Sequence, residues 1–369
     1  LVWALCAIAR AHTHTHARKS KPKGVFMQQK QNKYIQQDPE ELEFERRFSE
    51  AADGVQTELD GDFELHRIHS QQLGGLVADL GDWQRAAKIR DCGTFLRFAI
   101  PGDFGEKPFL YQASFCKDRL CSLCGWRRSL KVYSQISQVM DVIQNEYRFI
   151  FVTLTLRNVD DGHLVSAINY LQESFHLFMK YKEPRAAFRG YFKALEITKN
   201  PGLVGMEYHP HLHVIFAVDK KNYFQGDEYI PYEKLRALWK KALGVQYAPM
   251  VNIQAVKDKG TRDGRTVSYV NAIAEVAKYT LKSADLFKGS HTDQLQTVRT
   301  LTIALRGRRL CSFGGIFKKT WQDLKLPDPE EAELTDKDKI RSDVWYHIVN
   351  AVWDPKNKHY PLHYSGVED

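Results

Sequence analysis

Three histidines stand close together in the segment HPHLHVIF, which spans residues 209–216. Side chains of a β-strand alternate between its two faces, so His211 and His213 are expected on one face and Leu212 on the other. Two imidazoles held two residues apart on a rigid strand supply half of a metal site. His209 shares their parity and could join them, unless Pro210 interrupts the strand. Such a pair is also typical of surface residues, so a metal site needs a further ligand beside it.

An acidic residue on the preceding segment is our candidate for that ligand. Glu196 stands alone among apolar residues in ALEIT, where a carboxylate is costly to bury unless a cation or a hydrogen-bond donor balances it. Glu207 competes with it, being nearer in sequence but expected in a turn. Two imidazoles and one carboxylate suit Mg²⁺ or Mn²⁺ and leave positions open for water and phosphate oxygens. Ligand type alone does not exclude zinc.

A second group of reactive side chains lies in AEVAKYTLKS. Glu275, Tyr279 and Lys282 are four and three residues apart, which places them on one face of a predicted helix. There Tyr279 could act as a nucleophile toward phosphorus, with Lys282 favouring the phenolate and Glu275 as general base. The alternative is a solvated helix face. The catalytic interpretation requires the metal site to lie nearby.

Four cysteines have spacings that suit structural zinc. Cys116, Cys121 and Cys124 form C-x4-C-x2-C, and Cys92 lies 24 residues before Cys116. Six cysteines in a chain of 369 residues do not make a disulfide framework, whereas four thiolates complete a closed tetrahedral site. The alternative is a set of reduced structural cysteines, which is how we interpret Cys311.

Positive charge surrounds these cysteines and predicts contacts with nucleic acid. A zinc-stabilised knuckle would offer its basic side chains to phosphates and one aromatic ring to bases. The alternative is the solvated start of a helix. The candidate DNA-binding residues are Arg119, Trp126, Arg127, Arg128 and Lys131. A second basic segment, RGRRLCSFGGIFKK, surrounds a Gly-Gly turn farther along the chain.

Hydrophobic periodicity indicates the elements that must position these residues. Amphipathic helices alternate with strands rich in β-branched and aromatic residues, in the order helix, strand, helix, hairpin, helix, strand, helix. This order predicts an α+β fold with a central antiparallel β-sheet and flanking helices. The helices are expected at 126–147, 161–182, 231–243 and 267–287, and the strands at 148–158, 189–200, 209–218 and 247–256.

Charge is distributed unevenly along the chain. It carries 53 Lys and Arg against 45 Asp and Glu, a net charge of +8. Residues 1–26 contribute +5 and residues 27–80 contribute −7, which leaves +10 for residues 81–369. That excess suits a polyanionic partner such as nucleic acid. Long apolar stretches that would anchor the chain in a membrane are missing from the sequence, so we expect a cytoplasmic protein.

These observations divide the chain into five segments. We expect residues 1–26 to be a disordered or non-native N-terminal extension and residues 27–84 to be an acidic segment with surface helices. Residues 85–146 form the cysteine-rich zinc and DNA-binding region. Residues 147–320 form the catalytic domain, and residues 321–369 form a C-terminal helical segment.

The order of the motifs resembles a known family. The cysteine cluster with WRRSLK is followed by FVTLTLRN, HPHLHVIF, EVAKYTLK and SFGGIFK. This arrangement, over residues 85–320, is similar to the replication initiators of rolling-circle plasmids, the single-tyrosine Rep proteins of the HUH endonuclease superfamily. In that family the first motif matches residues 151–156, the metal-binding histidines match His211 and His213, and the tyrosine nucleophile matches Tyr279 with Glu275 one turn before it.

The resemblance implies a fold and a reaction. The fold would be the HUH endonuclease fold, with the histidine strand in the middle of the sheet. Tyr279 would nick one strand of the plasmid's double-strand origin, form a 5′-phosphotyrosine link and leave a 3′-hydroxyl primer, and Glu275 would activate water for the terminating cleavage. Expected partners are double-strand origin DNA, single-stranded DNA and a host helicase with the replication machinery. The chain would act as a monomer or dimer.

Two other classes of protein compete with this interpretation. An HUH relaxase or single-tyrosine transposase would use the same metal and tyrosine in mobilisation or transposition. A non-catalytic zinc-containing DNA-binding regulator would explain the cysteines and the charge. It would leave His211, His213, Glu196 and the face of Glu275 without a role.

Overall fold

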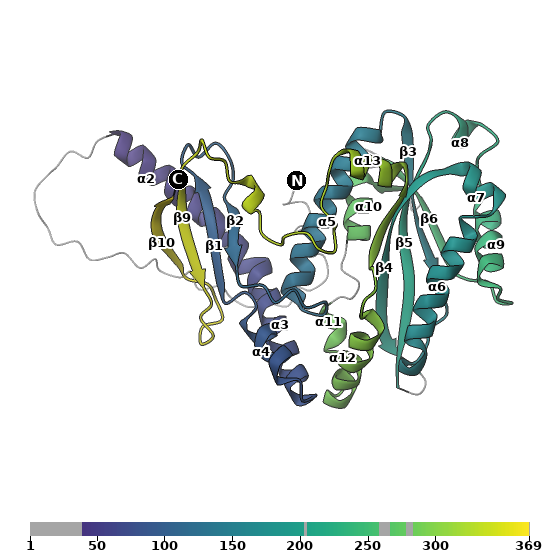
Figure 1. Ribbon diagram of the computed structural model, residues 1–369, viewed down its shortest axis with the longest axis horizontal. Coiled ribbons are helices and arrows are strands. Elements are labelled where there is room, and N and C mark those ends of the chain that lie inside the picture. Colours follow the sequence, from purple (N-terminus) through teal and green to yellow (C-terminus); the bar gives the residue numbers. More distant parts are fainter. Residues whose placement is uncertain (1–38, 203–204, 258–265, 278–282, 369) are drawn as a thin grey trace, which may run out of the picture.

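The computed structural model describes residues 39–202, 205–257, 266–277 and 283–368 (Figure 1). These residues form two β-sheets and the helices packed on them, with strand orders β7-β6-β3-β5-β4-β8 and β10-β9-β1-β2. All but one of the strand pairs are antiparallel, the exception being β6 with β7. The α+β class and the antiparallel sheet flanked by helices are therefore confirmed.

The six-stranded sheet contains the strands predicted from sequence. Its strands are β3 (Tyr147–Thr155), β4 (Phe188–Pro201), β5 (Met206–Asp219), β6 (Val251–Lys257), β7 (Thr266–Ser268) and β8 (Cys311–Gly315). Strand β5, which carries the histidines, pairs with β3 on one side and β4 on the other. The histidine segment is thus held in the interior of the sheet.

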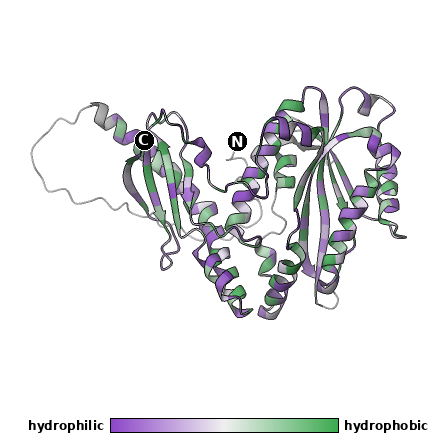
Figure 2. Ribbon diagram, in the orientation of Figure 1, coloured by the Kyte–Doolittle hydropathy of each residue, from purple (hydrophilic) through white to green (hydrophobic). Residues whose placement is uncertain are grey.

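Helices cover both faces of this sheet (Figure 1). Ile215 and Ala217 of β5 pack with residues of α5 (Ser122–Ile143), α10 (Tyr269–Ala277) and α13 (Ile316–Asp323). Val214 and Phe216 face the opposite way, toward α6 (Leu164–Phe178) and α9 (Tyr232–Leu243). Because both faces are buried, residues 214–218 of the strand form a continuous apolar run, and Figure 2 shows hydrophobic stretches in the strands of this sheet.

The four-stranded sheet pairs strands from residues 95–113 with strands from the C-terminal part of the chain. It consists of β1 (Phe95–Pro101), β2 (Phe109–Ala113), β9 (Tyr346–Val352) and β10 (Leu362–Glu368). The prediction of a C-terminal helical segment at 321–369 is wrong, because beyond the end of α13 its main elements are β9 and β10. The sequence of β9, YHIVNAV, is rich in β-branched and aromatic residues, and it pairs along its length with β1.

The described part of the acidic segment, residues 39–84, is mostly helical but is not confined to the surface, and residues 27–38 lie outside the described residues. It forms α2 (Pro39–Glu58), a π-helical turn (Leu59–Phe63), α3 (Glu64–Asp79) and α4 (Trp83–Asp91). Leu73, Leu76 and Val77 of α3 are buried in the main core. An apolar stripe on this helix outweighs the acidic composition of its surroundings.

Shorter elements complete the description. They are α7 (Lys182–Ala187), α8 (Asn222–Gln225), α11 (Ser283–Leu286), α12 (His291–Leu305) and two 3₁₀ turns (Asp161–His163 and Lys337–Lys339). Within the described ranges, every helix is too short or too polar to cross a membrane.

Candidate metal centre and nicking site

The register of β4 with β5 brings an acid to the histidines. Glu196 lies directly opposite His211, and His213 lies opposite Ala194, one pair farther along the same face. The strand continues through Pro210, because the pairing of β5 with β3 has ended at His211. A proline without an N–H is tolerated where no neighbouring strand needs that donor.

The three side chains converge on one point. The Nε2 atoms of His211 and His213 are 3.1 Å apart, and Oε2 of Glu196 lies 2.6 Å from Nε2 of His213 and 3.4 Å from Nε2 of His211. All three residues are buried, with exposed fractions of 5–7%. The structure therefore brings together, in one compact group, the carboxylate and the two imidazoles that the sequence pattern singled out.

Other groups fix the orientation of each imidazole. The Nδ1 atom of His213 lies 3.2 Å from the hydroxyl of Thr153, and Nδ1 of His211 lies 3.1 Å from the carbonyl oxygen of His209. These contacts leave both Nε2 atoms turned toward Glu196. Oxygen partners on the second ring nitrogen are the usual support of metal-binding histidines.

The electrostatics of the group also favour a bound cation. Burial alone would raise the pKa of Glu196, but hydrogen bonds with His211 and His213 outweigh it and hold the pKa well below its ordinary value. An ionised carboxylate therefore stays in a buried position. Removing a charge from water is tolerated only when an opposite charge or hydrogen bonds compensate it.

The distances fit a divalent ion. Ligands about 2.1 Å from an octahedral ion and at right angles to each other are about 3.0 Å apart, and the three separations in this group lie on either side of that value. Glu196, His211 and His213 form one of two groups of potential metal ligands among the residues that the structure describes. The donor set of two nitrogens and one oxygen fits Mg²⁺, Mn²⁺ or zinc.

His209 and Glu207, the other two candidate metal ligands, lie at the edge of this group. The ring of His209 is 5.2 Å from the ring of His211, and it contributes its carbonyl oxygen to the group instead of its imidazole. Glu207 accepts a hydrogen bond from Asn158 and lies opposite Asn200, near the turn of the hairpin. The geometry therefore favours Glu196 as the carboxylate ligand.

Helix α10, which precedes the predicted nucleophile in the chain, reaches this centre. Oε1 of Glu275, on α10, is 4.0 Å from Nε2 of His213, and its side chain is about one-third exposed. The required proximity between Glu275 and the metal group is therefore present. Tyr279 and Lys282 follow the last described residue of α10 and lie outside the described residues.

The four cysteines form the second group. Cys92 ends α4, Cys116 follows β2, and Cys121 and Cys124 lie at the start of α5. Sulfur atoms in this cluster are 3.5 to 3.7 Å apart, close to the separation of about 3.8 Å for a tetrahedral zinc site with 2.3 Å bonds. The spacing that suggested zinc thus corresponds to one compact cluster.

The surroundings of the cysteines suit thiolates. Backbone N–H groups of Lys117 and Asp118 point at the sulfurs of Cys124 and Cys116, at 3.2 and 3.4 Å. Arg67 is buried beside the cluster, and its Nε and Nη1 atoms have no hydrogen-bond partner among the described residues. Its positive charge would offset part of the negative charge that four thiolates and one Zn²⁺ carry together.

The thiols influence one another strongly. Hydrogen bonds among them, that from Cys116 foremost, lower the pKa of Cys121 and raise the pKa values of Cys92 and Cys124. In the absence of a metal ion, ionisation of one thiol therefore makes ionisation of the neighbouring thiols less favourable. A bound cation would remove that competition.

The basic residues near the cysteines have different environments. Arg127 is buried and bonded to Asp336, at 2.9 Å, and Lys131 binds the same carboxylate at 2.6 Å. The ring of Trp126 is buried and stacked on His66. We therefore assign Trp126 and Arg127 to the packing of the protein and withdraw the prediction that they contact DNA.

Arg119 and Arg128 remain available for a ligand. Arg119 is about one-third exposed and lies 3.4 Å from Glu330. Arg128 is half-buried, and its side chain makes no hydrogen bond or ion pair with another residue that the structure describes. Both side chains line the same pocket, which lies beside the metal centre.

Two functional contributions were missed from the sequence. Thr153, which supports His213, shares its strand face with Thr155, and two polar residues in an otherwise apolar strand were the available signal. Asp336 lies in a polar C-terminal stretch, where nothing local marks it as the partner of Arg127 and Lys131.

Comparisons with known proteins show which family the chain belongs to. The family model described as "Replication protein" matches residues 107–361. The chain is 36% identical over 295 residues to "Protein rep" of Bacillus amyloliquefaciens, which covers 76% of this chain and 85% of that protein. It is 38% identical over 270 residues to "Protein rep" of a Bacillus species, covering 70% and 85%.

A third relative matches over a longer stretch at lower identity. "Protein rep" of Streptococcus pneumoniae is 33% identical over 309 residues, covering 82% of this chain and 92% of that protein. No solved structure matches the chain. The family match and these relatives agree with the order of motifs found in the sequence, and the chain is therefore a member of the replication protein family, the rolling-circle plasmid initiators that those motifs resemble.

Proposed function

We propose that this replication protein starts plasmid replication by nicking one strand of the double-strand origin. The reaction would be metal-dependent and would proceed through a 5′-phosphotyrosine link to Tyr279. The observation that carries the proposal is the convergence of Glu196, His211 and His213 next to Glu275. A non-catalytic DNA-binding regulator would have no use for such a group.

The nicking step is assigned to residues of this chain. The Tyr279 oxygen forms a bond to the scissile phosphorus, and the bond from phosphorus to the 3′-oxygen breaks. The released 3′-hydroxyl then serves as the primer. Lys282 favours the phenolate form of Tyr279.

His211, His213 and Glu196 would hold Mg²⁺ or Mn²⁺. When bound, such an ion supplies positive charge that polarises the phosphate and stabilises the leaving oxygen. Thr153 and the carbonyl of His209 hold the imidazoles in place for it. The exposed part of Glu275 gives this carboxylate access to water for the terminating cleavage, as a general base.

The remaining assignments follow from the same function. We propose that residues 147–320 are the nicking domain with an HUH fold and that residues 85–146 hold a structural Zn²⁺ through the four cysteines. We propose DNA contacts for Arg119 and Arg128 but not for Lys131, whose ammonium group is bound to Asp336. We further propose that the protein acts in the cytoplasm on double-strand origin DNA and single-stranded DNA with a host helicase.

The test is covalent attachment to DNA. The protein is incubated with supercoiled plasmid libraries and with single-stranded oligonucleotides in Mg²⁺ or Mn²⁺, and denaturing gels are run with and without protease. A protease-sensitive adduct is expected from the wild type and not from Tyr279→Phe. An adduct that persists in Tyr279→Phe would place the nucleophile elsewhere. Salt-sensitive DNA binding without any adduct would favour the zinc-containing regulator.

Glu275 is tested with the same assay. Glu275→Ala is expected to form the adduct but to release it slowly by water. Equal loss of both steps would contradict the role of general base for Glu275 in the terminating cleavage alone.

A further inference from the structure

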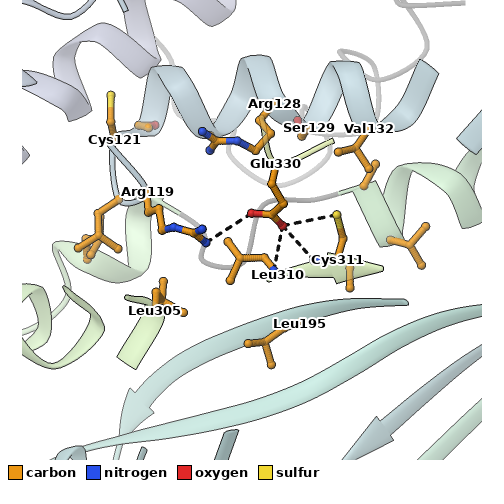
Figure 3. Close-up of a pocket in the computed structure, with 17 residues that line it drawn as sticks. Arg119, Cys121, Arg128, Ser129, Val132, Leu195, Leu305, Leu310, Cys311 and Glu330 are labelled. Carbon is orange, nitrogen blue, oxygen red and sulfur yellow. Dashed lines mark hydrogen bonds and ion pairs between the residues drawn. The ribbon is translucent and has the colours of Figure 1, made fainter. Parts of the chain in front are cut away.

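A pocket is lined by Cys121 of the cysteine cluster and by residues close in sequence to the metal ligands, among them Ala194. Figure 3 shows this pocket. Its walls are formed by the first turns of α5, by β4 and the start of β8, and by the ends of α10 and α12. It holds about 690 Å³ free of atoms, part of it open to solvent.

The pocket begins next to the metal ligands. Ala194, in its floor, lies opposite His213 and two residues before Glu196 on the same face of β4. Two residues of a strand span about 6.6 Å. Ala277, on another wall, lies two residues after Glu275. A DNA strand with its scissile phosphate at the metal centre could therefore place the adjoining nucleotide in the pocket.

The lining of the pocket suits a nucleotide. Leu305, Leu310 and Val132 contribute apolar surface that can cover the faces of a base. The rim carries the half-buried guanidinium of Arg128, which has no partner among the described residues. An arginine in that position provides the geometry and charge that a phosphate group requires.

The acid on the rim is already engaged. Glu330 accepts hydrogen bonds from the backbone N–H groups of Leu310 and Cys311, at 2.8 and 3.1 Å, and pairs with Arg119 at 3.4 Å (Figure 3). Its negative charge is therefore balanced within the wall. The unbalanced charge of the rim is that of Arg128.

We propose that this pocket binds the nucleotide adjoining the scissile phosphate, with the base against the apolar walls and its phosphate on Arg128. The inference rests on the proposed nicking function, and it assigns to that function a site for base selection. Cys121 and Ser122 form part of the wall, so the cysteine cluster helps to set the shape of the base site.

The test measures binding without cleavage. The full chain carrying Tyr279→Phe is titrated, without Mg²⁺, Mn²⁺ or chelator, with a short fluorescent single strand of random sequence. The same titration uses a strand of equal length in which every base is replaced by an abasic residue. Ser129→Trp fills the pocket from α5, and Ser134→Trp, on the exposed face of the same helix, is its matched control.

Ser129→Trp is expected to weaken binding of the base-carrying strand about tenfold, the order of one lost base contact, and to leave the abasic strand nearly unaffected. Arg128→Ala is expected to weaken binding of both strands. Its control is Arg148→Ala, which removes an exposed arginine at the end of β3 that lies away from the metal centre. Equal effects of Ser129→Trp on both strands, or none on either, would overturn the proposal.

A second measurement needs no substitution in the pocket itself. Photocrosslinking of a 5-iodouracil-containing random strand to the Tyr279→Phe chain is expected to label peptides that line the pocket, Cys311 among them. Labels confined to other surfaces would overturn the proposal. Adduct formation by the wild type together with a negative binding result rejects the pocket and keeps the nicking function, whereas base-dependent binding without any adduct rejects the nicking function and keeps the pocket.

Discussion

Thr153 and His213 face each other across the pairing of β3 with β5, and the threonine hydroxyl lies 3.2 Å from Nδ1 of the imidazole. The contact turns Nε2 of His213 toward Glu196. A side chain on β3 therefore orients a candidate metal ligand on the neighbouring strand β5.

Replacing this hydroxyl should weaken metal binding. Thr153→Val keeps the shape of the side chain and removes the partner of Nδ1, and a drop in Mn²⁺ affinity of about 10- to 100-fold is expected. Thr153→Ser should retain most of the affinity. Calorimetric titration with Mn²⁺ measures both. Equal affinity of wild type and Thr153→Val would show that packing alone holds His213.

The two candidate carboxylates can be separated by conservative substitutions. Glu196→Gln removes the buried charge between the imidazoles, so Mn²⁺ binding and metal-dependent adduct formation should fall by at least about 100-fold. Glu207→Gln, near the hairpin turn, should leave both unchanged. If Glu207→Gln proved to be the more damaging substitution, the ligand assignment would have to be reversed.

The cysteine cluster should contain zinc. Metal analysis of the purified protein is expected to give about one equivalent. Cys121→Ser should lose the ion and lower the midpoint of thermal unfolding by about 10 °C or more, because ligation and folding are coupled. Cys311→Ser, outside the cluster, should keep the zinc. A full zinc content in Cys121→Ser would argue against four-thiolate coordination.

His66 should make the stability of the protein depend on pH. Burial lowers the pKa of His66 to about 4 from its ordinary value of 6.5, so the unfolded chain takes up a proton at a higher pH than the folded chain. The stabilisation is complete above pH 6.5 and is lost as the pH falls toward 4, by up to about 3 kcal/mol.

Urea unfolding of wild type and His66→Phe at pH 7 and at pH 5 measures this effect. The phenyl ring can keep the stack on Trp126, and any acid-induced loss of zinc affects both proteins. The wild type should therefore lose more stability than the variant between the two values. Parallel losses would mean that His66 does not titrate in this interval.

Local pattern was sufficient for strands β3 to β6 of the six-stranded sheet and for the histidine pair, whereas β7 and β8 were not predicted as strands. Alternation along HPHLHVIF placed His211 and His213 on one face, and a lone acid in an apolar strand identified Glu196. These residues lie on two strands that follow each other in the sequence, and the alternation of residues within each strand predicts which side chains share a face.

Features that depend on distant partners could not be predicted. The burial of Arg127 follows from Asp336, 209 residues away, and the C-terminal strands form because β1 offers them an edge. The sequence around Arg127 does not indicate that Asp336 is its partner, and the sequence of the C-terminal strands does not indicate that they pair with β1. The same limit explains why basic residues near the cysteines could be named but not sorted into those that face solvent and those that hold the fold together.

The position of β1 has a consequence for the order in which the chain folds during synthesis. Every strand of the six-stranded sheet lies within residues 147–315, so that sheet is complete while the C-terminal strands are still being made. Strand β1 then has only β2 beside it, and an isolated two-stranded hairpin is marginally stable. The part of the protein that carries the cysteines is thus completed last, when β9 has left the ribosome. By then the six-stranded sheet, which carries the histidines, has already formed.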